Sequence, residues 1–160
     1  MKRLFAIGIV LLSLMGCGSR NAQKSTESTS EINSDAAVEV FIIHAAQRCA
    51  TCKAIDAVVA EVLENDFSDD VKAGKIVFRD VDGSKQENRE LLTKYEIYST
   101  SLVLDAGGKV TNLTNDAFQY ALSNPDKLKE ILRANISQAL QIMEWLQTLL
   151  DGGTAPVLTA

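Results

Sequence analysis

The sequence predicts a single α/β domain whose mixed central sheet of about four strands is flanked by helices. Short runs of apolar, β-branched residues alternate with longer segments in which apolar residues recur at helical spacing. A turn rich in glycine joins the last two short strands, and a long amphipathic helix closes the domain. The resulting order of elements, β-α-β-α-β-β-α over residues 36–151, is typical of a mixed sheet covered by helices.

The first half of this domain contains two predicted strands and two predicted helices. Val38 to Ile43 is a continuous apolar run apart from Glu39, which predicts a buried strand. Ala50 to about Phe67 carries its apolar residues on one helical face. Lys75 to Val81 predicts a second strand, and Lys85 to Tyr95 predicts a charged helix on the surface.

The second half begins with a predicted β-hairpin. Ser101 to Leu104 and Lys109 to Leu113 are its strands, and Asp105 to Gly108 is its turn. The segment from Asp116 to Ser123 has no clear period, so its conformation stays open at this point.

The last predicted helix runs from Pro125 to about Leu150, with the proline at a first position where it is tolerated. At 1.5 Å per residue such a helix is about 39 Å long, which is more than a domain of this size needs. Its distal turns around Trp145 therefore either extend the core or meet a second copy of the chain (a homodimer) or a membrane partner.

The chain begins with features of an export signal. Residues 1–3 are basic at two positions, and the apolar run from Leu4 to Leu14 is too short to span a bilayer. The next residues, Leu14-Met15-Gly16-Cys17, resemble the bacterial lipobox. The resemblance implies that residues 1–16 are a lipoprotein signal peptide and that Cys17 is acylated. The alternative is an ordinary signal peptide with a chance cysteine.

The two ends of the chain differ in composition from the domain. Residues 17–35 are polar after the lipidated cysteine and predict a flexible tether, and residues 152–160 predict a disordered tail. Lipid anchoring places the domain on the extracytoplasmic, periplasmic side of a bacterial cell envelope. Gly18, rather than an aspartate, follows Cys17, and by resemblance to enterobacterial sorting this favours the outer membrane slightly.

The net charge argues against a nucleic-acid partner. Removal of residues 1–16 takes away Lys2 and Arg3 and leaves 14 cations against 21 anions, a net charge of −7. Nucleic-acid binding calls for a basic face, and an electrostatic hold on anionic lipid needs the same. Attachment to the membrane therefore depends on the lipid anchor.

Cys49 and Cys52 form a C-A-T-C pair at the start of the first predicted helix. Such spacing places both sulfurs on one side of the first turn, with a Cα separation of about 5–6 Å that suits a disulfide. The helix N-terminus favours a thiolate, so Cys49 is the candidate nucleophile and Cys52 the candidate resolving thiol. Arg48 and Lys53 add positive charge nearby.

The order of elements, with the cysteine pair at the first helix, resembles the thioredoxin family over about residues 38–136. Asp80 to Asp82 followed by Tyr95 to Ile97, and Leu102 to Leu104 followed by Gly107 to Val110, carry the rest of the likeness. The resemblance implies a thioredoxin-like fold and a thiol–disulfide oxidoreductase without a cofactor beyond its own disulfide. It also implies protein thiols and disulfides as partners, with electrons supplied by a membrane thiol relay.

Five positions depart from the family pattern. Arg48 stands where thioredoxins carry a tryptophan, Ala50-Thr51 replaces Gly-Pro, and the apolar Ile43 replaces a buried aspartate. Ser101, preceded by Thr100, aligns with the family's cis-proline, which faces the cysteines. These departures predict a narrower range of substrates than that of a general thioredoxin.

Other interpretations of the cysteine pair stay open. A purely structural disulfide closes a very short loop and stabilises little by the loop-entropy argument. A structural zinc site needs four protein ligands, and His44 is the only histidine in the chain. Two thiolates can instead hold a soft ion such as Cu(I) or trivalent arsenic. His44 itself either lies beneath the cysteines and tunes them or is a rim residue with an ordinary hydrogen bond.

Overall fold

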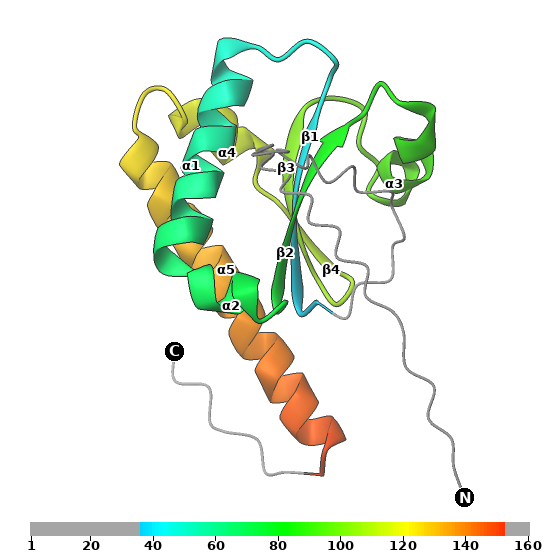
Figure 1. Cartoon of the computed structure of the whole chain (residues 1–160), viewed down its shortest axis with the longest axis vertical. Coiled ribbons are helices and arrows are strands. Elements are labelled where there is room, and N and C mark those ends of the chain that lie inside the picture. Colours follow the sequence, from blue (N-terminus) through cyan, green and yellow to red (C-terminus); the bar gives the residue numbers. More distant parts are fainter. Residues whose placement is uncertain (1–35, 153–160) are drawn as a thin grey trace, which may run out of the picture.

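The computed structural model describes residues 36–152 as an α/β domain built on a four-stranded mixed sheet (Figure 1). The strand order is β2-β1-β3-β4. The central strand β1 (Val38–His44) pairs in parallel with β2 (Ile76–Asp82) and antiparallel with β3 (Ser101–Ala106). Strand β4 (Lys109–Asn112) completes the sheet as the antiparallel partner of β3.

Helices cover both faces of the sheet, but unequally. One face carries α1 (Ala50–Asp66) and α5 (Pro125–Leu150), with α4 (Thr114–Tyr120) packed against both of these helices. Among residues 36–152, the opposite face carries α3 (Arg89–Lys94) and the short turn that precedes it (Figure 1). The two faces therefore enclose a large and a small apolar core.

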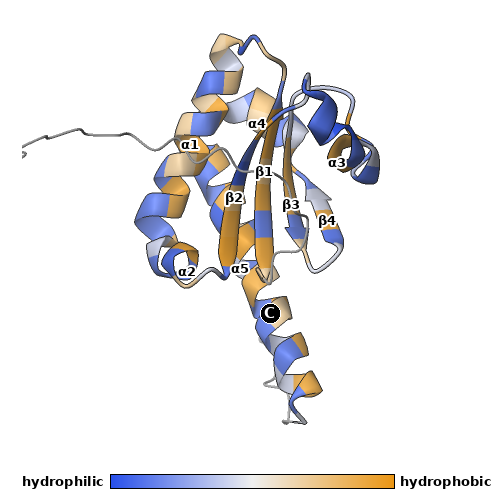
Figure 2. Ribbon diagram, turned by 45° about the vertical axis from the view of Figure 1, so that its right-hand side comes forward, coloured by the Kyte–Doolittle hydropathy of each residue, from blue (hydrophilic) through white to orange (hydrophobic). Residues whose placement is uncertain are grey.

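Strand β1 lies between these two cores because its side chains alternate between the faces. Val40 and Ile42 belong to the large core under α1 and α5, whereas Phe41 and Ile43 belong to the small core under α3. All four side chains are buried. A strand covered on both faces must be apolar on both, which explains the unbroken apolar run in the sequence. Figure 2 shows β1 as mostly hydrophobic, whereas hydrophobic and hydrophilic residues alternate along α1 and α5.

The predicted fold class is confirmed, with a mixed four-stranded sheet, flanking helices and a long C-terminal helix in the arrangement expected of a thioredoxin-like domain. The predicted helix from Lys85 to Tyr95 is shorter in the structure. It begins as a 3₁₀ turn, η1 (Gln86–Asn88), and is α-helical only in α3. A short helix, α2 (Ser68–Lys72), follows α1 and was not predicted.

The segment left open by the sequence, Asp116 to Ser123, overlaps helix α4, which begins two residues earlier at Thr114. Leu113, Ala117 and Ala121 are buried at intervals of four residues, so they form one apolar stripe on this helix. The hydroxyl of Thr114 accepts a hydrogen bond from the backbone N–H of Leu102 (3.1 Å), which ties the start of α4 to strand β3. The stripe is too short to show a period in the sequence alone.

Helix α5 is 26 residues long and extends past the sheet, as Figure 1 shows. Its buried side chains are Leu128, Leu132, Ile136 and Ala139, all within residues 125–139 at the start of the helix. The distal turns carry the exposed side chains of Leu146, Leu149 and Leu150. The partner expected for these turns stays a prediction. None of the helices in residues 36–152 combines the length and apolarity needed to cross a bilayer.

Candidate redox site

The cysteine pair lies where three strand ends meet. Strands β1 and β2 run in parallel, so His44 and Asp82 are paired at the same edge of the sheet. The antiparallel strand β3 begins at this edge, with Ser101 paired to Ile43. The chain leaves β1 at His44 and reaches α1 through residues 45–49. The register of three strands thus positions the start of α1.

Cys49 and Cys52 are joined by a disulfide, with their Cα atoms 5.1 Å apart. Cys49 is the N-cap residue of α1 and has extended backbone angles (φ −71°, ψ 167°). Its sulfur accepts a hydrogen bond from the backbone N–H of Cys52 (3.1 Å). The same N–H group favours negative charge on this sulfur when the pair is reduced.

The two sulfurs differ in their access to solvent. Cys49 is exposed, whereas Cys52 is only 5% exposed and packs on the inner face of α1. An incoming disulfide therefore reaches Cys49 first. The roles of Cys49 as nucleophile and Cys52 as resolving thiol stay predictions.

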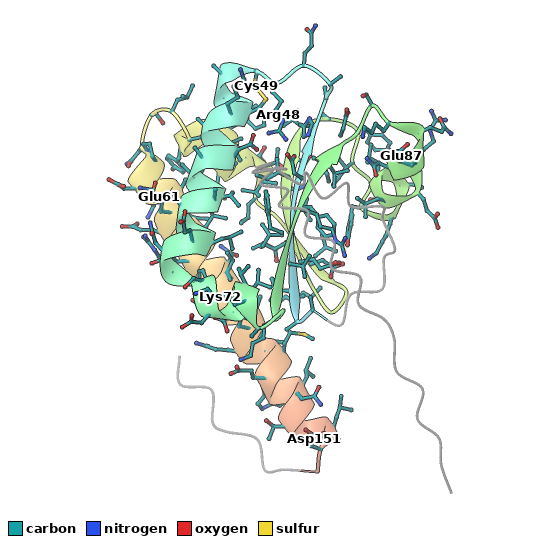
Figure 3. The ribbon with its side chains drawn as sticks, viewed as in Figure 1. Arg48, Cys49, Glu61, Lys72, Glu87 and Asp151 are labelled. Atoms are coloured by element: carbon teal, nitrogen blue, oxygen red, sulfur yellow. A yellow bond between two sulfur atoms is a disulfide. The ribbon has the colours of Figure 1, made fainter. Side chains whose placement is uncertain are left out.

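A charged cluster lies beside the disulfide. The guanidinium of Arg48 forms ion pairs with Asp56 on α1 and Asp80 on β2. Nε2 of His44 lies 3.1 Å from the same carboxylate oxygen of Asp80. Figure 3 shows Arg48 next to Cys49 at the N-terminal end of α1. The positive charge of Arg48 is thus shared with two carboxylates and is not directed only at Cys49.

Asp56 is the least satisfied member of this cluster. Its Oδ2 atom pairs with Arg48, but its buried Oδ1 atom accepts no hydrogen bond from any residue in the described range 36–152. Burial raises the pKa of the Asp56 carboxyl above its ordinary value, and Asp80 raises it further. Arg48 and His44 act in the opposite direction without cancelling the rise.

His44 belongs to the cluster through Asp80. Its side chain is largely buried, and its Nδ1 atom lies 2.7 Å from the carbonyl oxygen of Ala45. A carbonyl oxygen can only accept, so Nδ1 carries the hydrogen in this contact. The histidine therefore has two partners at the edge of the sheet and connects β1 to β2.

The remaining predicted site residues take different positions. Lys53 is exposed on α1, and its backbone N–H donates to the carbonyl of Cys49 (3.1 Å). Ser101 is buried, and its hydroxyl donates to the carbonyl of Ser99 (3.1 Å). Thr100 is half-buried immediately before it. The hydroxyl of Ser101 is thus used to shape its own loop at the edge where the cysteines lie.

Sequence reasoning missed two members of the site, Asp56 and Asp80. The signal for Asp56 was its position one helical turn after Cys52, next to the inward-facing Ile55. The signal for Asp80 was weaker, because it depends on the register that pairs Asp80 with Ile42 across two parallel strands.

Within residues 36–152, no group of three or more histidine, cysteine, aspartate or glutamate side chains is arranged to hold a metal ion. The soft-ion alternative requires only the two sulfurs of the reduced pair, so its test is direct binding.

Two thioredoxin-related structures are among the solved structures that resemble this chain. A mutant thioredoxin from Halobacterium salinarum NRC-1 is 22% identical and has a TM-score of 0.44, over 63% of this chain and 76% of that one. Trxlp from Edwardsiella tarda EIB202 is 14% identical with the same TM-score, over 62% of this chain and 84% of that one. No family model and no curated protein matches the chain. At these scores the two likenesses add nothing to what the strand order already shows.

Proposed function

We propose that this protein is a thiol–disulfide oxidoreductase that works through Cys49 and Cys52. The observation that carries the proposal is the asymmetry of the pair at the helix start. The exposed sulfur caps α1 and accepts an N–H hydrogen bond, and its partner is covered one turn further on. A purely structural crosslink does not require this difference.

The reaction begins with the reduced pair. The thiolate of Cys49 attacks one sulfur of a partner's disulfide, and the other sulfur of that disulfide leaves as a thiolate. Cys52 then attacks the mixed disulfide at Cys49 and releases the second partner thiol. The protein is left with its internal disulfide, and we propose that a membrane dithiol relay reduces it again.

The experiment is reduction of a protein disulfide by the purified chain. Insulin with dithiothreitol as electron donor is a suitable substrate, and reaction is followed by precipitation of the freed chains. We expect Cys49→Ser to lose the catalysed rate completely. With dithiothreitol removed, pre-reduced Cys52→Ser should instead accumulate a mixed disulfide with insulin that is visible as an added mass. Equal catalysis by wild type and Cys49→Ser would overturn the proposal.

The same preparation tests the soft-ion alternative. The reduced chain is titrated with Cu(I) and with trivalent arsenic while the two thiols are counted. Tight binding of one ion per cysteine pair, without disulfide reduction in the insulin assay, would assign the site to ion capture.

We further propose that the protein is a lipoprotein anchored through Cys17 in a bacterial cell envelope. Residues 1–16 and Cys17 lie outside the described residues, so the proposal rests on the lipobox resemblance alone. We expect the mature chain to begin at Cys17 and to partition with membranes, with the outer membrane favoured. Cys17→Ser should remain unprocessed by the lipoprotein peptidase or be released as soluble protein. Recovery of the wild type wholly in the soluble fraction would contradict anchoring.

A further inference from the structure

We infer that Asp56 accepts the proton that Cys52 loses when it resolves the mixed disulfide. This inference rests on the proposed function, because it assigns a role within the same exchange reaction. It adds to the site a residue from α1 that neither the cysteine motif nor the order of elements contains.

The first support is the position of Asp56 on α1. It follows Cys52 by four residues, and side chains at this spacing are neighbours on one helix surface, with Cβ atoms about 5–6 Å apart. Cys52 is buried, and the Asp56 side chain is only 24% exposed. Bulk water therefore has limited access to the thiol, and the carboxylate is the acidic group one turn below it on the same helix.

The second support is the state of the two carboxylate oxygens. Arg48 holds Oδ2, which fixes the carboxylate group, while the buried Oδ1 has no hydrogen-bond partner in residues 36–152. Leaving a buried acceptor unpaired costs about 1–3 kcal/mol. A fixed carboxylate with one free oxygen is the arrangement that a proton acceptor needs.

The charged surroundings suit this role. Burial and the Asp80 carboxylate raise the pKa of Asp56, while Arg48 from the loop and His44 from β1 keep the group ionisable. A general base works best when its pKa is near the pH at which it operates. The displacement of the Asp56 pKa toward neutrality thus makes it a better acceptor than an ordinary surface aspartate.

The other acids at this edge of the sheet, Asp80 and Asp82, each accept hydrogen bonds through one carboxylate oxygen. Oδ1 of Asp80 is shared by Arg48 and His44, and its side chain is half exposed. Asp82 accepts hydrogen bonds from the backbone N–H and the hydroxyl of Ser84, which lower its pKa. Of these three acids, Asp56 is the one with a buried oxygen that has no hydrogen-bond partner in residues 36–152.

The step balances as follows. The Cys52 thiol gives its proton to Oδ1 of Asp56, directly or through one water molecule, and its sulfur attacks Cys49. The bond between Cys49 and the partner's sulfur breaks as the Cys49–Cys52 bond forms. The partner leaves as a thiolate and takes up a proton. The cysteine pair has lost two electrons, and the partner's disulfide has gained them.

The test separates the two steps of the reaction with dithiodipyridine, a small disulfide whose thione product absorbs light at acidic as well as neutral pH. The full chain carrying Cys17→Ser has only Cys49 and Cys52 as thiols. Mixing its reduced form with excess reagent releases a first thione at a rate proportional to reagent. The second thione is released by Cys52 at a rate independent of reagent.

We expect Asp56→Asn to slow the second phase about 100-fold at neutral pH, as for loss of a general base, and to leave the first phase within about threefold. In the parent chain the second rate should rise through the pKa of Asp56 and then level off. In Asp56→Asn it should keep rising toward the pKa of the thiol. A role of Asp56 in structure alone would not move this plateau.

Two further variants serve as controls. Glu64→Gln lies on the exposed side of the same helix and should leave both phases unchanged. Asp80→Asn should shift the plateau to lower pH without removing it, because Asp80 raises the pKa of Asp56. Thermal melting of each variant, oxidised and reduced, shows that the chain is folded.

The outcomes separate the inference from the proposed function. Two thione phases in the parent chain with an unchanged second phase in Asp56→Asn would overturn the role of Asp56 and leave the exchange reaction standing. A parent chain that reduces neither dithiodipyridine nor insulin would overturn the proposed function itself. If Asp56→Asn melts below the assay temperature, Asp56→Glu decides: recovery of the plateau supports the inference, and a steadily rising rate contradicts it.

Discussion

Two carboxylates on opposite sides of the sheet have opposite surroundings. Asp105, on β3 beneath α3, is 5% exposed and accepts hydrogen bonds from the hydroxyl of Tyr95 (2.6 Å), the backbone N–H of Gly108 (2.7 Å) and the ammonium of Lys94 (3.3 Å). Asp56, beside the disulfide, is paired through one oxygen and free at the other.

This difference in hydrogen bonding reverses the effect of burial on the two pKa values. Burial acts to raise both. The hydrogen bonds from Tyr95, Gly108 and Lys94 more than compensate at Asp105, and its pKa falls below the ordinary value of 3.8. At Asp56 the ion pair with Arg48 does not offset the effect of burial, and the pKa rises above the ordinary value. A fully bonded acid stabilises the fold in its charged form, whereas an incompletely bonded acid retains the capacity to take up a proton.

The largest expected effect is on stability at Asp105. Asp105→Ala should lower the free energy of unfolding by about 3 kcal/mol, because it leaves the hydroxyl of the half-buried Tyr95 without its acceptor and Lys94 without its counter-ion. Urea denaturation at neutral pH measures the change. Glu90→Ala, on the exposed surface of α3, is the control and should stay within about 0.5 kcal/mol of wild type. If Asp105→Ala loses no more stability than Glu90→Ala, the hydrogen bonds that Asp105 accepts do not stabilise the fold as we expect.

The next effect is on the pH dependence of stability. Asp105 and Asp56 should contribute slopes of opposite sign to the free energy of unfolding as pH changes. The lowered pKa of Asp105 contributes stability above pH 3.8 that is lost as pH falls through the folded-state pKa. The raised pKa of Asp56 costs stability as pH rises from 3.8 through its folded-state pKa. Each slope is at most about 1.4 kcal/mol per pH unit.

Urea denaturation across the acidic range compares wild type with Asp105→Asn and with Asp56→Asn. The advantage of wild type over Asp105→Asn should shrink below pH 3.8. The advantage of wild type over Asp56→Asn should fall as pH rises above that value. If both differences change with pH in the same direction, the two pKa values are not shifted in opposite directions as we expect.

A smaller effect is expected on stability at Asp56 itself. Asp56→Asn should change the free energy of unfolding by less than about 1 kcal/mol at neutral pH. The lost ion pair with Arg48 is offset by removal of a charge that burial disfavours, and Arg48 keeps Asp80. A destabilisation as large as that of Asp105→Ala would show that Asp56 is a structural acid.

The smallest expected effect on stability is at Lys94, the most exposed side chain that donates a hydrogen bond to Asp105. Lys94→Met should cost only about 0.5 kcal/mol, because the ammonium is 44% exposed and both its salt bridge to Asp105 and its contact with the Tyr95 ring are screened by water. The same denaturation series measures it. A cost equal to that of Asp105→Ala would mean that Lys94, and not Tyr95, holds the carboxylate.

The sequence predicted the parts of the fold that depend on local pattern. Three of these parts carry a local signal: the unbroken apolar run of β1, the apolar stripe of α1, and the proline at the first position of α5. The cysteine pair was equally visible, because its chemistry depends on four consecutive residues at a helix start. The short helices α2 and α4 were not predicted, because five to seven residues contain too little of a period.

The charged cluster was harder to predict because its members come from separate elements. Arg48 and Asp80 are 32 residues apart and meet only because β1 and β2 pair in a particular register. The sequence therefore showed Arg48 as a free positive charge near Cys49. Asp105 was similarly interpreted as a turn residue, although its carboxylate accepts bonds from α3 and from the turn at Gly108.

The most direct test is an NMR titration of the carboxyl carbons of Asp56 and Asp105 in the oxidised and the reduced protein. We expect Asp56 to titrate above pH 3.8, with a midpoint that moves when the disulfide is reduced, because its free oxygen then has a thiol as its neighbour. Asp105 should titrate below pH 3.8 with the same midpoint in both states. An Asp56 midpoint at or below pH 3.8, or one that does not respond to reduction, would contradict the account.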